Sequence, residues 1–459
     1  MSTPPDTEER NRYASGMRRG LDVAADLADE EPGQPGWPQH EPSFGPPETR
    51  PVWARRPTRS VADALGAGWL VTREPPGSTT GAHTTQAGPL AGLSVAVKDI
   101  IDVAGLPTRN GTPGALWREP TESAKAWHRL AEAGAQCIGK AATHEMAWGV
   151  TTPQIAHPTH PDHITGGSSG GSAACVAAGV SHAGLGTDTN GSVRIPAALC
   201  GIVGFRPTTG STELTGVTPL APEQDVVGPM TADVSTCAAM LEVLLDRSLR
   251  RVPDHVETLS GLRIGVLTRT GRLDPAVAEA YLDTLTALER EGAEIISCDT
   301  PLPGLSDHIS LVAMLISSAA LHAAAVHADP TSFGDRARAP LTVGEDLTPA
   351  DASAVDQARD TLTVRTARLF SDERLDAFLT PTTPCPAPLR GADTVQIADK
   401  EYSVSDALTR FMAWAPVTGM PAVSVPVPVR GLPVGMQVMA PAHRDDTCIR
   451  VALSIEQLT

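Results

Sequence analysis

The sequence predicts an α/β protein with a mixed β-sheet, because short apolar runs of strand length alternate with longer segments of helical periodicity. The chain has 459 residues, of which 41% are hydrophobic, so a sizeable core is expected in one large domain or in two or three smaller ones. Glycine and proline occur 41 times each, above their usual ~7% and ~5% of residues, which indicates many turns between the elements.

The first elements are expected before residue 181. Residues 93–97 form an apolar run that predicts a buried strand, with Lys98 at its carboxyl end. A helix is expected over 123–135, and the next strand follows over 136–140. The segment 172–180 is rich in alanine and glycine, which predicts a helix packed closely on its neighbours.

The same alternation continues in the second half of the chain. A helix is expected to open at Asp274, which caps it, with Pro275 in its first turn, and to stop at Gly292. Val277, Tyr281, Leu285 and Leu288 would fall on one face of this helix. Further strands are expected over 262–267, 293–297, 376–380 and 422–427.

The longest apolar segment, residues 311–328, is interrupted by two serines and two histidines, so it predicts a buried helix and not a membrane span. The net charge of −17 comes with no basic patch, which argues against nucleic-acid binding. Seven cysteines are scattered singly, which argues against a disulfide framework or a zinc site. Because no secretory leader is visible either, a cytoplasmic location is expected.

The amino-terminal segment differs in composition from the rest of the chain. Residues 1–50 carry ten acidic and five basic side chains, and seven of the twenty residues from Pro32 to Pro51 are proline. We therefore expect residues 1–59 to form an acidic, proline-rich extension that is partly disordered or loosely attached, with a short helix over 11–27. The main domain would span 60–459, and removing 1–50 is expected to leave catalysis largely intact.

Two glycine–serine segments and one lysine carry the chemistry. Residues 166–172 read Gly-Gly-Ser-Ser-Gly-Gly-Ser, and residues 187–196 read Thr-Asp-Thr-Asn-Gly-Ser-Val-Arg-Ile-Pro. A serine hydroxyl is a poor nucleophile until a base takes its proton. Thirteen histidines leave a Ser-His-Asp triad open. A lysine at the end of a buried strand, such as Lys98, is an alternative base because burial favours its neutral form.

These segments resemble the amidase signature family over roughly residues 88–459. The resemblance rests on 88–105, 166–174 and 186–208, and on the later landmarks 225–230, 379–382 and 431–437, which occur in the family's order. It implies the amidase signature fold, a large mixed β-sheet covered by helices on both faces. It also implies a reaction that needs no cofactor and no metal.

The resemblance implies a Ser–cis-Ser–Lys triad of Ser192, Ser168 and Lys98. Ser192 would attack the amide carbonyl, Ser168 would relay its proton across a cis peptide bond, and Lys98 would accept that proton in its neutral form. Asp99 follows Lys98 directly, but adjacent strand residues point to opposite faces, so the two need not pair.

The loop before Ser192 is expected to stabilise the reacting carbonyl. Backbone N–H groups of Thr189, Asn190, Gly191 and Ser192 would form the oxyanion hole. Asn190 stands where the family often has glycine or alanine, and its side chain could face the substrate. Three further residues would support the site from behind, namely Ser169, Asp188 and Arg194.

Each feature also has a structural alternative. Lys140, at another strand end, is expected to be structural, and Trp148 could line the pocket or belong to the core. The cluster of His157, His160 and His163 suggests a metal site, but none is expected there. Residues 166–170 also fit the G-x-S-x-G nucleophile elbow, yet no strand pattern precedes them.

The sequence therefore predicts an amidase that hydrolyses the C–N bond of a small-molecule carboxamide to a carboxylate and ammonia or an amine. One alternative is the glutaminase (A-type) subunit of an amidotransferase complex. Another is an inactive scaffold, which the complete triad argues against. No nucleic-acid or membrane partner is expected, and a homodimer remains open.

Overall fold

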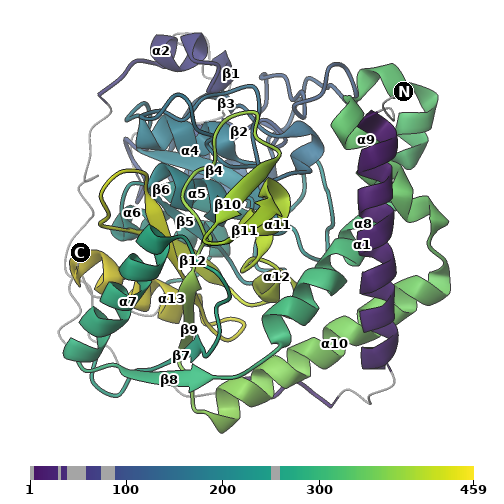
Figure 1. Cartoon of the computed structure of the whole chain (residues 1–459). Coiled ribbons are helices and arrows are strands. Elements are labelled where there is room, and N and C mark those ends of the chain that lie inside the picture. Colours follow the sequence, from purple (N-terminus) through teal and green to yellow (C-terminus); the bar gives the residue numbers. More distant parts are fainter. Residues whose placement is uncertain (1–4, 29–32, 39–57, 74–87, 250–258, 459) are drawn as a thin grey trace.

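The computed structural model describes residues 5–28, 33–38, 58–73, 88–249 and 259–458. The proline-rich stretch 39–57, predicted to be disordered, therefore lies outside the described residues. The rest of the molecule is built on one large sheet with helices on both faces, as predicted (Figure 1).

The main sheet has eleven strands in the order β1-β3-β2-β4-β6-β5-β12-β13-β9-β7-β8, and a separate hairpin joins β10 and β11. Two parts of the main sheet are parallel, β3-β2-β4 and β8-β7-β9, while the strands between them pair antiparallel. The strands are β1 (Leu70–Arg73), β2 (Ser94–Lys98), β3 (Gln136–Ala141), β4 (Ala183–Asp188), β5 (Val203–Arg206), β6 (Val226–Thr231), β7 (Arg263–Leu267), β8 (Glu294–Cys298), β9 (Ala377–Pro381), β10 (Thr394–Ile397), β11 (Lys400–Ser403), β12 (Ala422–Val427) and β13 (Val434–Met439).

Helices cover both faces of this sheet. Apolar side chains of α6, α7 and α13 form one core with the middle and far strands, and α8, α10 and α12 form a second core with residues of β9, β12 and β13. The helices are α1 (Pro5–Ala28), α2 (Val61–Gly66), α3 (Lys125–Glu132), α4 (Gly170–Ala177), α5 (Arg194–Cys200), α6 (Val234–Leu245), α7 (Pro275–Arg290), α8 (Leu302–Ala328), α9 (Asp335–Val343), α10 (Pro349–Asp372), α11 (Val404–Thr409), α12 (Trp414–Thr418) and α13 (Asp445–Leu458).

The predicted strands are all present, each within one residue of its expected ends. The predicted helices are present too, and α7 begins at Pro275 with Asp274 as its side-chain cap. The apolar segment at 311–328 belongs to α8, which starts earlier, at Leu302. This helix is long and apolar enough to cross a membrane, but it packs against α1, α9 and α10 along its length.

The amino-terminal helix differs from the expectation of a loosely attached extension. Helix α1 lies along α8, α9 and α10 at one side of the molecule (Figure 1). Ala24 and Leu27 are buried in the core with α8 and α10, and the Thr361 hydroxyl donates to the Leu27 carbonyl at 3.3 Å. The sequence missed this because acidic and basic residues on the exposed face mask the narrow apolar stripe.

Helix α4 sits unusually close to the sheet, as its small residues predicted. A Cβ added to Gly184 of β4 would lie 2.9 Å from the Ser172 side chain, and one added to Gly186 would lie 2.8 Å from Ser169 Oγ. Only glycine permits this approach at both positions. The close packing brings the loop before α4 next to the carboxyl end of β2.

Candidate active site

Lys98 and Ser168 meet at the carboxyl end of β2. Lys98 Nζ lies 2.7 Å from Ser168 Oγ and 2.7 Å from Thr187 Oγ1, and both Lys98 and Ser168 have no exposed surface. The Gly167–Ser168 peptide bond is cis, which the family resemblance implied. The three side chains come from β2, from the loop before α4 and from β4.

The environment of Lys98 favours a neutral amine. Burial lowers the pKa of Lys98 to about 7, although the carboxylates of Asp225 and Asp188 oppose this shift. In the described part of the chain, Lys98 has no ion-pair partner. A lysine with this pKa exchanges protons near neutral pH, which suits a general base.

Lys140 is equally buried but is paired. Its Nζ lies 3.2 Å from Asp99 Oδ1 and donates to Thr108 Oγ1 at 2.8 Å. The strand register aligns Val97 with Lys140 and Lys98 with Ala141, so the two lysines lie on opposite faces of the sheet. Asp99 therefore faces Lys140 and not Lys98.

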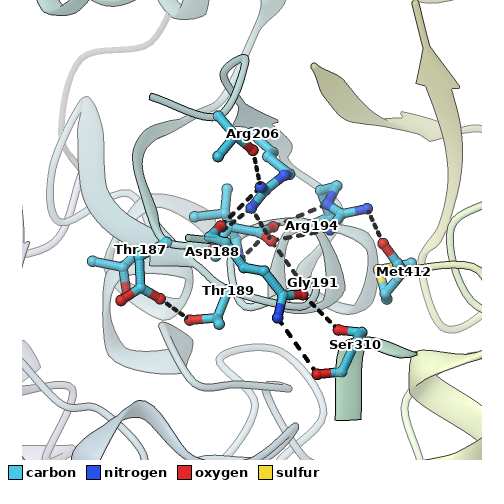
Figure 2. Close-up of polar contacts among 12 residues, drawn as sticks. Thr187, Asp188, Thr189, Gly191, Arg194, Arg206, Ser310 and Met412 are labelled. Atoms are coloured by element: carbon cyan, nitrogen blue, oxygen red, sulfur yellow. Dashed lines mark hydrogen bonds and ion pairs between the residues drawn. The ribbon is translucent and has the colours of Figure 1, made fainter. Parts of the chain in front are cut away.

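Asp188 anchors the loop that carries Ser192. Its carboxylate accepts from Arg194 Nε at 2.9 Å and Nη2 at 3.0 Å, and from Arg206 Nη1 at 3.3 Å (Figure 2). Burial opposes ionisation of Asp188, but the two guanidinium groups hold the pKa of this carboxyl well below its usual range. The Gly191 N–H also donates to Asp188 Oδ1, at 2.8 Å.

Arg194 in turn is fixed by two distant segments. Its Nη1 donates to the Met412 carbonyl at 3.1 Å (Figure 2). The same Nη1 donates to Gln437 Oε1 at 2.6 Å. Gln437 also donates to Thr380 Oγ1 at 3.2 Å. Gln437 and Thr380 lie in two of the later motifs, 431–437 and 379–382. Gln437 therefore positions Arg194, and Arg194 positions the loop that carries Ser192.

Ser192 lies at the surface of a cavity and is 7% exposed. Its hydroxyl has no hydrogen-bond partner among the residues that the structure describes, Ser168 included. The Ser192 carbonyl accepts from the Ser169 N–H at 3.2 Å, which ties the two serine segments together. Ser169 Oγ donates to the Thr187 carbonyl at 3.3 Å.

The expected oxyanion hole differs at Gly191, whose N–H is already donated to Asp188. The N–H groups of Thr189, Asn190 and Ser192 have no acceptor within the described residues and remain the candidate donors. Gly191 has a φ of +101°, and a Cβ added there would lie 2.6 Å from Met412 Sδ. Gly191 therefore allows the backbone conformation of the loop, while its N–H donates to Asp188 and is not among the candidate oxyanion donors.

The cavity beside Ser192 has a volume of about 410 Å³, within the usual range for small-ligand sites. Thr189, Asn190 and Ser192 form one part of its wall. Trp148 lines the cavity and also belongs to the core around β2, so both interpretations of this residue hold. Tyr13 of α1 contributes to the wall as well.

The histidine cluster is engaged with the backbone. His157 Nε2 lies 2.9 Å from the Leu199 carbonyl, and His163 Nδ1 lies 2.7 Å from the Ala387 carbonyl. Across the described ranges, no group of three or more histidine, cysteine or acidic side chains has a metal-binding arrangement.

Sequence reasoning missed three residues at this site. Thr187 hydrogen-bonds to Lys98, a contact that was not predicted although Thr187 belongs to the motif at 187–196. Asp225 accepts from Thr189 Oγ1 at 2.5 Å and so supports the same loop. Tyr13 lies in the segment predicted to be loosely attached, and its only signal is an aromatic residue within a helical pattern.

Comparisons with known proteins agree with the geometry. Residues 77–449 match the family model described as Amidase. The chain is 34% identical to an amidase of Pseudomonas putida over 75% of this chain and 78% of that protein. It is 31% identical to mandelamide hydrolase of Pseudomonas putida, covering 82% and 81%. It is 33% identical to the A-type subunit of the glutamyl-tRNA(Gln) amidotransferase of Deinococcus radiodurans, covering 80% and 84%.

The fold agrees as well. A crystal structure of an amidase superposes with a TM-score of 0.78 at 31% identity, covering 86% of this chain and 95% of that one.

Proposed function

The chain belongs to the amidase family, and on that premise we propose that Ser192 is the nucleophile of a Ser–Ser–Lys triad with Ser168 and Lys98. The family membership makes the protein a hydrolase of amide bonds. The observation that supports the triad is the 2.7 Å contact between Lys98 Nζ and Ser168 Oγ. Burial lowers the pKa of this lysine to about 7.

In the first half of the reaction, Ser192 Oγ bonds to the amide carbon and the carbonyl π electrons move to oxygen. The Ser192 proton passes to Ser168 Oγ, whose own proton passes to Lys98 Nζ. When the intermediate collapses, the C–N bond breaks and the relay returns a proton to the leaving nitrogen. Ammonia or an amine departs, and an acyl ester remains on Ser192.

In the second half, water attacks the ester through the same relay, which releases a carboxylate and restores Ser192. The relay requires Ser192 Oγ to approach Ser168 Oγ, and catalytic hydrogen bonds often tighten only in the substrate complex. The N–H groups of Thr189, Asn190 and Ser192 would stabilise the oxyanion in both halves.

The test uses a fluorophosphonate, which modifies activated serine hydroxyls, followed by peptide mass mapping. The modified residue should be Ser192, and Ser192→Ala should lose both labelling and ammonia release while keeping its unfolding temperature. Modification of Ser168 in a protein whose Ser192 stays unmodified would overturn the assignment.

The alternative is a glutaminase subunit that works inside an amidotransferase complex, as the name of one relative states. The two functions differ in whether the isolated chain turns over small amides. Activity of the purified chain alone supports the amidase. Activity on glutamine that appears only with partner chains supports the amidotransferase role.

The remaining assignments extend this proposal. We place the protein in a reducing compartment such as the cytoplasm, because its seven cysteines are scattered singly along the sequence and are all buried. The substrate would be a small-molecule amide, because the cavity beside Ser192 has a volume of about 410 Å³, within the usual range for small ligands. The start of the main domain at residue 60 remains a prediction, and so does the possible homodimer.

A further inference from the structure

Part of the wall of the cavity beside Ser192 comes from the amino-terminal helix α1. Arg12, Tyr13 and Gly16 of α1 line the same cavity as Ser192 and Asn190. Tyr13 is separated from Ser192 by about 180 residues of sequence, yet both residues line the same cavity. The amino-terminal segment therefore lines the candidate substrate site, and removing residues 1–50 would take away this part of the wall, contrary to the expectation that catalysis stays largely intact.

Tyr13 is held in place by Trp148. The indole Nε1–H of Trp148 donates to the Tyr13 hydroxyl at 2.9 Å. The two rings meet edge to face, with centroids 5.8 Å apart and planes at 75°. Trp148 is only 5% exposed, while Tyr13 is half-buried. The pair forms a fixed aromatic surface, because each ring is oriented by the other.

Helix α1 is shaped to lie close against α8. A Cβ added to Gly16 would lie 2.5 Å from Leu311 Cδ2, and one added to Gly20 would lie 2.1 Å from Val312 Cγ2 and 2.7 Å from the His308 carbonyl oxygen. Glycine inside a helix is less favourable than alanine, so the glycines at these two positions allow close contact with α8 at the expense of intrinsic helix stability. The close contact sets the position of Tyr13 at the cavity.

The remaining lining indicates what the cavity accepts. Besides the aromatic pair, it is lined by apolar side chains of five residues, Ala147, Val150, Leu220, Leu311 and Met314. Burial raises the pKa of the Asp307 carboxyl in this lining well above its ordinary value, which favours its neutral form, so the lining is not balanced in charge. The ionisable lining side chains include two arginines and two aspartates. They are Arg12, Arg19, Asp307 and Asp406.

We propose that α1 forms a wall of the acyl pocket, and that Tyr13 and Trp148 together make the enzyme prefer amides whose acyl group carries an aromatic ring. The inference rests on the proposed function, because it assumes that the acyl group enters the cavity beside Ser192. Aromatic rings gain edge-to-face or stacked contact with such a pair beyond the area that they bury. A short aliphatic acyl group gains little from it.

The first test compares phenylacetamide with propionamide by ammonia release. For Tyr13→Ala, kcat/KM on phenylacetamide should fall about tenfold more than on propionamide. Tyr13→Phe keeps the ring and should lose no more than about a third of this preference. Arg18→Ala, on the exposed side of α1, is the matched control and should change neither substrate.

The second test measures binding without turnover. On the Ser192→Ala background, calorimetry should show that Tyr13→Ala raises the Kd of phenylacetamide about tenfold and leaves that of propionamide nearly unchanged. If Tyr13→Ala weakened kcat/KM or binding equally for both amides, Tyr13 would have only a structural role. If it changed neither amide, α1 would not form part of the acyl pocket. Because binding is measured separately, failure of the triad assignment would not imitate either result.

Discussion

Two buried lysines on neighbouring strands share their burial but differ in the charge of their nearest partners. Lys98 and Lys140 both have no exposed surface, and burial lowers the pKa of both. Lys140 lies 3.2 Å from the Asp99 carboxylate, which favours its charged form. Among the described residues, Lys98 Nζ hydrogen-bonds only to the hydroxyls of Ser168 and Thr187. The charge of the nearest partner, and not depth, therefore distinguishes the environment of Lys140 from that of the proposed base.

The largest expected effect follows from removing the unpaired lysine. Lys98→Ala should lower kcat/KM at neutral pH by about 10²–10⁴-fold, the usual contribution of a positioned base. At high pH the loss should shrink, because hydroxide can partly replace the missing base. The measurement is kcat/KM across pH for both proteins. Near-normal activity of the variant at neutral pH would point to a histidine instead.

The paired lysine should show its effect in stability and not in catalysis. Asp99→Asn leaves the Lys140 charge without its partner, and breaking a buried ion pair costs about 3–5 kcal/mol. Urea unfolding should show this loss, while the folded fraction keeps the wild-type kcat/KM. A folded Asp99→Asn variant with wild-type stability but poor turnover would mean that the roles are exchanged.

A third variant would convert one environment into the other. Thr187→Asp would place a carboxylate beside Lys98, where Thr187 Oγ1 now lies 2.7 Å from its Nζ. A neighbouring opposite charge raises a lysine pKa by roughly 1–3 units, so activity at pH 7 should fall about 10–100-fold. Activity should recover at higher pH. The control Thr187→Val removes the hydroxyl without adding charge, and it should not move the acid side of the profile.

The smallest expected effect is that of a chelator. The proposed relay from Ser192 to Lys98 needs no metal, so EDTA should leave kcat/KM unchanged. Loss of activity in EDTA that zinc restores would instead assign a role to the cluster around His157. This cluster would then have to release its present contacts with backbone carbonyls.

The sequence predicted the fold class and six strands of the main sheet, because these buried strands are short apolar runs with clear ends. Strand β4 was missed, since its Ala-Gly-Leu-Gly-Thr-Asp sequence lacks the usual β-formers. Its glycines are required by the close contact with α4, which is a tertiary constraint. Helix α1 was predicted, but its docking was not, because Gly16 and Gly20 show their purpose only against α8.

The candidate site was predicted in part for a similar reason. Lys98, Ser168 and Ser192 stand in motifs that a family resemblance identifies. The engagement of Gly191 N–H by Asp188 depends on the folded loop, and Tyr13 approaches the cavity from the other end of the chain. Neither relation leaves a local pattern in the sequence.

The contrast between the two lysines can be measured directly, because the chain contains only four lysines, Lys98, Lys125, Lys140 and Lys400. With ¹³Cε-labelled lysine, each resonance can be assigned by a single substitution and followed across pH. The account predicts that the Lys98 resonance titrates with a pKa of about 7, and that Lys140 titrates at a higher pH because Asp99 favours its charge. A Lys98 resonance that stays protonated to pH 10 would contradict its role as the base.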